Sequence, residues 1–230
     1  MERGTAYFVN EDRIFSGEGK IELYYKLLSY SNPYKKEGKN APCGIGAPWG
    51  KIFRTSFLRK NNIIFDLQLR WAQDIIFNLY AVAKARQVRY INVPLYNYNY
   101  NYLGTMHLKY NPKLYEFYIR FAKARYEWYK DCINLLNERE RDIYYLGTFF
   151  NILFCLKNGP LHPLYDGSKK QLLADCNKLM ELDCFSWTQT NRRKIKLKVT
   201  FRNKLVQFFV RHRLWLALHY ILSEKSLLSK

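Results

Sequence analysis

The sequence places one carboxylate, Asp74, where an ionised side chain is favoured. Residues 70–86 are expected to form an amphipathic helix, because apolar side chains recur there at steps of four, four and three residues. This apolar stripe consists of Trp71, Ile75, Leu79 and Val82. Asp74 falls in the first turn, where the helix dipole favours the charged form. Such a carboxylate can accept a proton in catalysis, or it can only stabilise the helix by about 0.3–1 kcal/mol, and the residue pattern leaves both interpretations open.

Shorter elements are expected on both sides of this helix. The pattern predicts short helices at residues 21–28 and 55–61, the second with a hydroxyl side chain that can cap its start. The apolar run at 6–9 predicts a short strand, and alternation of apolar and polar residues predicts another strand at 88–93. In residues 96–102 tyrosines alternate with asparagines, which predicts a further strand with one aromatic face and one amide face.

The rest of the chain is expected to be helical. The apolar spacing predicts helices at about 114–136, 143–156, 172–182 with Ser168 at its start, and 201–222. The sequence therefore predicts an α/β class with three regions, namely 1–110 with the sheet, 111–191 helical, and 192–230 basic and amphipathic. The two longest uncharged apolar stretches, 143–156 and 214–223, are shorter than the roughly 20 residues that span a bilayer, so no transmembrane helix is expected.

Composition indicates a folded protein of a reducing compartment. Apolar residues make up 48% of the chain and aromatic residues 17%, which argues against disorder. The five cysteines show neither a CxxC pair nor zinc-finger spacing, so neither a zinc site nor a disulfide framework is predicted. These cysteines are Cys43, Cys132, Cys155, Cys176 and Cys184. The first residues show no signal-peptide pattern, which favours a cytoplasmic location.

Positive charge is concentrated at the carboxyl end. The formal net charge is +19, and the last 39 residues carry 11 basic side chains against one acidic side chain. Because these cations are interleaved with aromatic residues such as Phe201, Phe208 and Trp215, the segment is basic and amphipathic. It is expected to bind a polyanion, either an anionic phospholipid surface or nucleic acid. Charge alone supports nucleic acid, since no zinc-finger, RNP or helix-turn-helix signature is found.

Several short motifs follow one another between about residues 41 and 107. They are Ala47–Phe53, Phe57-Leu58, Ile64-Phe65, Asp74–Phe77, Ala83–Ala85 and Pro94–Tyr98. In this order and spacing they resemble the second half of bacterial family 2 glycosyltransferases. That half contains a "PWxK" segment, a short helix, an "xxF" turn, an acidic "ED" pair that opens a helix, and a closing "LYxY" strand. The ordered series is more specific than any single motif.

The resemblance implies a GT-A fold, so that a partial GT-A (Rossmann-like) sheet is expected before the helical region. It also implies an inverting transfer of a sugar from a nucleotide sugar to a glycan or lipid-linked acceptor. Asp74 matches the aspartate of the "ED" pair, which is the catalytic base of the family, whereas Gln73 stands where the glutamate would be. The same resemblance suggests acceptor binding by Trp49, Lys51 and Gln73. Without it, Trp49 is equally a core residue and Lys51 a solvated lysine.

In this family a divalent metal, Mg²⁺ or Mn²⁺, is held by an Asp-x-Asp motif in the nucleotide-binding first half. The sequence contains no Asp-x-Asp, so no complete metal site is expected. His107 is a weak candidate for a metal or diphosphate contact, and an ordinary exposed histidine is the alternative. We therefore expect the acceptor-side portion of a truncated enzyme, which is a gene fragment or is completed by a separate chain that supplies the nucleotide-binding half.

These features together predict a glycosyltransferase of bacterial surface polysaccharide assembly. The basic segment 192–230 would hold it peripherally on the anionic inner face of the cell membrane. Two other functions stay open at this point, namely a basic protein that binds nucleic acid without a specific recognition motif and a non-enzymatic accessory protein.

Overall fold

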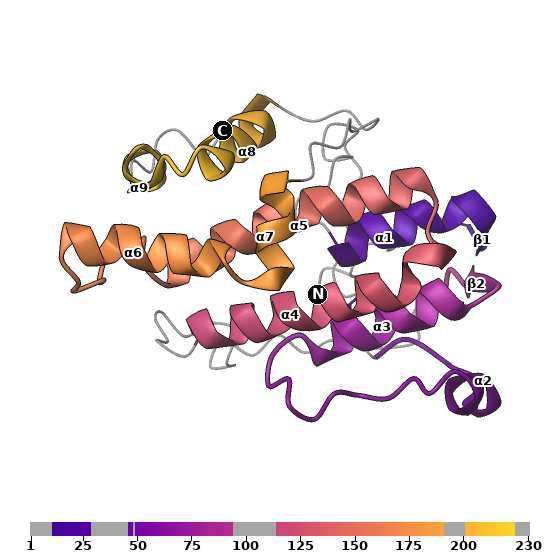
Figure 1. Cartoon of the computed structure of the whole chain (residues 1–230). Helices are drawn as coiled ribbons and strands as arrows, with labels where there is room; N and C mark the ends of the chain where they lie inside the picture. The colour runs from indigo at the N-terminus through magenta and orange to yellow at the C-terminus, as the bar shows by residue number, and fades with distance from the viewer. Residues whose placement is uncertain (1–10, 29–45, 48, 94–113, 191–200, 224–230) are drawn as a thin grey trace, which may run out of the picture. The chain divides into compact units, whose positions relative to one another are not determined.

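The computed structural model describes residues 11–28, 46–47, 49–93, 114–190 and 201–223. It divides the chain into two compact units (Figure 1). The first contains residues 1–111 and 127–144, and the second contains 112–126 and 145–230. The helices α4 (Leu114–Cys132) and α5 (Glu138–Asn158) therefore each contribute to both units. The region boundaries predicted near residues 110 and 191 fall outside the described residues and stay predictions.

The first unit consists of short helices and one pair of strands. Its elements are β1 (Arg13–Ser16), the 3-10 helix η1 (Gly17–Lys20), α1 (Ile21–Leu28), α2 (Thr55–Lys60), α3 (Gln73–Lys84), β2 (Gln87–Tyr90) and the 3-10 helix η4 (Ile133–Leu135). Helix α1 packs against α3 (Figure 1). The helices predicted at 21–28 and 55–61 are confirmed, and the helix predicted at 70–86 is confirmed with slightly tighter ends. The hydroxyl cap predicted for the second helix is wrong, because Arg54 occupies the N-cap position of α2 and no side chain caps the helix there.

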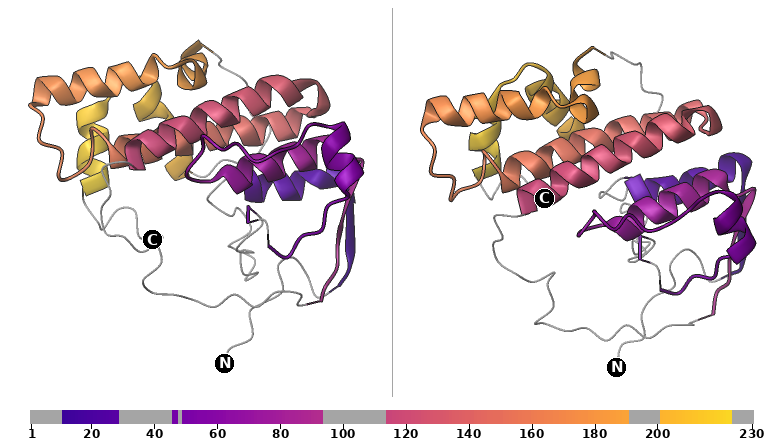
Figure 2. Two further views of the ribbon diagram at one scale, coloured as in Figure 1. Left: turned by 90° about the horizontal axis from the view of Figure 1, so that it is seen from below. Right: turned by 60° about the horizontal axis from the view of Figure 1, so that its bottom comes forward.

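Strands β1 and β2 pair antiparallel, with Arg13 opposite Tyr90 and Ser16 opposite Gln87 (Figure 2). Strand β2 confirms the first part of the predicted strand at 88–93. Strand β1 was not predicted, because its four residues (RIFS) do not alternate between apolar and polar. In the described part of the chain this pair is the whole sheet, so the α/β class fits only loosely and the expected partial GT-A sheet is not shown. The strands predicted at 6–9 and 96–102 lie outside that part.

Lysine 20 joins the amino-terminal elements to the end of α3. The ammonium of Lys20 donates hydrogen bonds to the backbone carbonyls of Val82, Ala83 and Ala85 at 3.1, 3.3 and 3.2 Å. The last carbonyls of a helix have no amide partner within the helix and carry the negative end of its dipole, so a cation is favourable there. This contact fixes η1 against the carboxyl end of α3.

The other side of α3 is held by an aromatic cluster around Phe77. The ring of Phe65 stacks on Phe77 with centroids 4.3 Å apart, and Phe53 meets it edge-on at 5.2 Å. Ile63 and Ala81 are buried in the same cluster. Both ring arrangements are favoured for aromatic pairs, so the segment 53–65 is held against α3 by burial and by ring geometry.

The second unit is helical in its described residues. It adds α6 (Lys169–Met180), α7 (Asp183–Thr190), α8 (Phe201–Arg211) and α9 (Trp215–Ser223) to its parts of α4 and α5. Its core includes Ile152, Leu156, Leu179, Phe185 and Trp215, all at most 2% exposed. The predicted role of Ser168 is confirmed, because its hydroxyl accepts a hydrogen bond from the amide of Gln171 at the start of α6.

Helix α5 is longer than predicted at its start. It begins at Glu138 rather than near residue 143, because Asn137 and Glu140 form a reciprocal cap. The amide of Asn137 donates to Oε2 of Glu140 at 2.9 Å, and the amide of Glu140 donates to Oδ1 of Asn137 at 3.0 Å. Helix α7 was not predicted, because its residues (DCFSWTQT) include few strong helix formers and only three apolar side chains.

The helix predicted at 201–222 is two helices. Arg213 between α8 and α9 has a left-handed backbone with φ 52°, which ends α8 and turns the chain. The turn buries Trp215, whose indole N–H donates to Oδ1 of Asn177 at 2.9 Å. Across the described residues, no helix is both long enough and apolar enough to cross a membrane.

Replacing Phe77 should destabilise the first unit strongly. Phe77→Ala is expected to lower the free energy of unfolding by about 3–5 kcal/mol, because it removes a buried ring and both of its aromatic partners' contacts. Urea denaturation followed by circular dichroism measures this loss. Phe208→Ala is the matched control, because Phe208 is 51% exposed, and it should change the free energy by no more than about 0.5 kcal/mol. Equal losses for the two variants would contradict the assignment of Phe77 to the core.

Candidate functional site

Asp74 lies half-buried in the first turn of α3, as predicted. The residue before the helix, Ala72, has a left-handed backbone with φ 57° and ψ 23°. Oδ1 of Asp74 accepts a hydrogen bond from the amide of Ile75 at 2.9 Å, which satisfies one of the free N–H groups at the helix start. The amide of Asp74 itself also favours the ionised form of this carboxylate.

Asn78, one turn after Asp74, fastens the preceding segment to α3. Its side-chain amide donates to the carbonyl of Gly46 at 2.6 Å and to the carbonyl of Asp74 at 2.8 Å. Asn78 is only 3% exposed, so these two acceptors satisfy a group that would otherwise be buried without a partner. Gly46 permits the approach, because a Cβ there would lie 2.8 Å from Cγ1 of Ile75.

The sequence-based prediction missed Asn78. A polar residue within the apolar run of α3, four positions after Asp74, was the available signal. Such a residue must find hydrogen-bond partners when its helix is buried. Asp74 and Asn78 are four residues apart and share a helix face, so the pattern indicated that Asn78 lies beside Asp74 at the start of α3.

Lys51 is brought into the electrostatic field of Asp74. Its ammonium donates a hydrogen bond to the carbonyl of Ala47. Burial lowers the pKa of Lys51 from 10.5 to about 8, and the carboxylate of Asp74 opposes that decrease. Burial likewise raises the pKa of Asp74, while the amide of Ile75 and the charge of Lys51 oppose the increase. Burial therefore makes the carboxylate of Asp74 more basic than usual and the ammonium of Lys51 more acidic than usual, and each charge influences the pKa of the other.

The other predicted site residues are less closely associated with Asp74. Trp49 is 39% exposed and Gln73 is exposed, so both side chains are accessible to a ligand. Their predicted roles in acceptor binding are not tested by this geometry. His107 lies outside the described residues, and its candidate metal or diphosphate contact stays a prediction.

The described residues do not provide a metal site. No group of three or more histidine, cysteine, aspartate or glutamate side chains among them is arranged to hold an ion. Four of the five cysteines, at 132, 155, 176 and 184, are buried and free, and burial raises the pKa of each thiol. The donor set of the described residues therefore does not fit the Mg²⁺ or Mn²⁺ that the resemblance implies.

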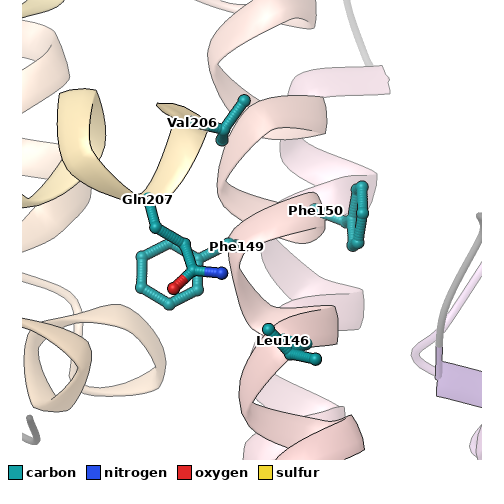
Figure 3. Close-up of a pocket in the computed structure, with 5 residues that line it drawn as sticks. All are labelled: Leu146, Phe149, Phe150, Val206 and Gln207. Carbon is teal, nitrogen blue, oxygen red and sulfur yellow. The ribbon is translucent and has the colours of Figure 1, made fainter. Parts of the chain in front are cut away.

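A hollow in the second unit lies between α5 and α8 (Figure 3). It is lined by Leu146, Phe149, Phe150, Val206 and Gln207. None of these five is a carboxylate, a histidine or a cysteine, so the hollow offers neither a general base nor a nucleophile. Among the residues singled out by sequence, Asp74 is therefore the one with the clearest arrangement for proton transfer.

Comparison with known proteins gives one relationship. The chain matches no protein-family profile and no solved structure. Over part of its length it is similar to a glycosyltransferase. That protein is the uncharacterized glycosyltransferase EpsJ of Bacillus subtilis (strain 168), with 28% identity over 81 residues, which is 35% of this chain and 24% of EpsJ. The similarity thus covers about a quarter of the relative's length.

The low pKa of Lys51 makes stability depend on pH. Above about pH 8 the folded chain has lost the Lys51 proton, whereas the unfolded chain keeps it until about pH 10.5. The contribution of this residue to stability therefore rises with pH across that window and is most unfavourable below it. We expect Lys51→Met to be more stable than the unsubstituted chain at pH 7, with an advantage that shrinks toward pH 10.

Urea denaturation at intervals from pH 7 to pH 10 measures this difference. Lys60→Met, which removes an exposed lysine of α2, is the control for the loss of one lysine. A stability difference for Lys51→Met that stays constant with pH would show that the Lys51 amine is not desolvated as described.

Proposed function

We propose that this chain forms the acceptor side of a family 2 glycosyltransferase of the GT-A type and that Asp74 is its catalytic base. The observation that carries the proposal is the half-buried Asp74 carboxylate at the start of α3, with Oδ1 held by an amide. The partial similarity to a glycosyltransferase and the ordered motifs around Asp74 support it.

In the proposed reaction, Oδ2 of Asp74 accepts the proton of an acceptor hydroxyl. The hydroxyl oxygen attacks the anomeric carbon of the sugar as the bond from that carbon to the nucleoside diphosphate breaks, and the configuration inverts. A base with a raised pKa is better suited to this transfer, because general-base catalysis is most effective when the pKa approaches the working pH. The hydrogen bond from Ile75 fixes the orientation of the carboxylate.

Lys51 has a positioning role in this proposal. Its positive charge favours the ionised form of Asp74, which is the form that can accept a proton. Trp49 and Gln73, both exposed, would contact the acceptor, a glycan or a lipid-linked sugar of bacterial surface polysaccharide assembly. The nucleotide sugar would be bound outside the described residues or by a separate chain, and no step is assigned to a metal ion.

Substituting Asp74 tests the role of the base. The full chain, alone and mixed with a candidate nucleotide-binding partner, is incubated with a panel of radiolabelled nucleotide sugars and a bacterial membrane extract as the source of acceptor. Asp74→Asn should lower the rate of transfer by about 10²–10⁴-fold, the usual contribution of a general base. The measurement is the label recovered in the glycan or lipid fraction.

Asp66→Asn is the matched control, because Asp66 is an exposed carboxylate in the loop before α3. It should leave the rate near that of the unsubstituted chain. Turnover retained in Asp74→Asn would exclude the base role, and absence of transfer under all of these conditions would contradict the transferase itself.

A further inference from the structure

Helix α8 exposes a face of two aromatic rings and a cation. Phe201 is 80% exposed and Phe208 is 51% exposed, and Lys204 between them is exposed as well. Positions separated by three, four or seven residues share one helix face, so the three side chains lie along one stripe. Val210 on the opposite side of the helix is buried in the core of the second unit, and Gln207 beside the stripe is buried as well.

The turn after α8 and the start of α9 expose further apolar side chains. Leu214 and Leu216 are 41% and 40% exposed, whereas Trp215 and Leu218 are each 1% exposed. The core therefore takes Trp215 and Leu218 and leaves the two leucines at the surface. We define the α8 face as Phe201, Lys204, Phe208, Leu214 and Leu216.

The cations of this segment are divided between the core and the surface. Arg211 turns inward, because its guanidinium donates to the hydroxyl of Tyr145 and lies 5.7 Å from the ring of Phe149. Lys204 and Arg213 are exposed. The last 39 residues carry 11 basic side chains and one acidic side chain, so the segment that contains the α8 face has a strongly positive net charge.

We propose that the α8 face docks this chain on an anionic phospholipid surface. Exposed phenylalanine and leucine side chains beside lysine and arginine match the chemistry of a membrane interface, where apolar groups enter the acyl boundary and cations meet the headgroups. Aromatic stacking surfaces for single-stranded nucleic acid also combine rings with cations, but leucine side chains cannot stack on bases. The aliphatic members of the face therefore favour lipid.

Vesicle sedimentation with the full chain tests the α8 face. Vesicles of phosphatidylcholine alone are compared with vesicles that contain an equal part of phosphatidylglycerol, at low and high salt. We expect binding to the anionic vesicles, weakened by salt because the headgroup contacts are screened. Phe208→Asp should weaken this binding by at least about tenfold, since burying such a ring contributes about 1.5–3 kcal/mol. Lys204→Ala should weaken it by about fivefold.

Two matched controls distinguish the effect of the α8 face on vesicle binding from a general loss of positive charge or of exposed apolar surface. Leu67→Asp changes a side chain that is 93% exposed in the first unit, and Lys60→Ala removes the same charge as Lys204→Ala from the exposed α2. Both should bind vesicles almost as the unsubstituted chain does. Circular dichroism spectra verify that every variant is folded.

Several results would overturn the proposal. These are no sedimentation with anionic vesicles at low salt, equal binding to neutral vesicles, or losses in Phe208→Asp and Lys204→Ala that match those of their controls. A short single-stranded DNA oligonucleotide gives the last comparison. If Phe208→Asp weakens binding to the oligonucleotide as much as vesicle binding, the face recognises polyanions in general and not a membrane. The inference stands apart from the transferase proposal, because a chain without transfer activity would still sediment.

Discussion

Asn78 is buried in α3 and donates to two backbone carbonyls from different parts of the chain, those of Gly46 and Asp74. Because a buried amide or carbonyl without a partner costs about 1–3 kcal/mol, both hydrogen bonds constrain the fold. They hold the segment that leads to Lys51 against the first turn of α3. The charges of Lys51 and Asp74 are consequently both in partly buried surroundings. The ring cluster around Phe77 continues this attachment along the same helix.

The longer helices could be predicted from sequence because they contain several turns of regular apolar spacing. Helices α1 to α3 and most of α4 to α6 agree with the predictions, and Ser168 begins α6 as expected. The sequence-based predictions failed where an element depends on a partner distant in the sequence, or on a local hydrogen bond between side chain and backbone. Strand β1 depends on a partner more than 70 residues later, and the start of α5 depends on the reciprocal cap of Asn137 and Glu140.

The candidate site was only partly predictable for the same reason. The position of Asp74 in a helical first turn follows from periodicity, but the raised pKa of its carboxyl depends on burial that no local pattern reports. The interaction with Lys51 depends on how residues 46–51 return to α3, which Asn78 determines. The basic carboxyl-terminal segment was also only partly predictable. Arg211 is one of its basic residues, but its guanidinium is partly buried and contacts Tyr145 and Phe149.

The contacts of Lys20 have a consequence for the order of folding. Its ammonium joins residues that are 62 to 65 positions apart, so a long loop must close before these hydrogen bonds can form, and loop closure of this kind slows folding. The first unit also includes residues 127–144. During synthesis it therefore cannot be completed until the start of α5 has left the ribosome, whereas sequential pairs such as α8 and α9 can associate as soon as they emerge.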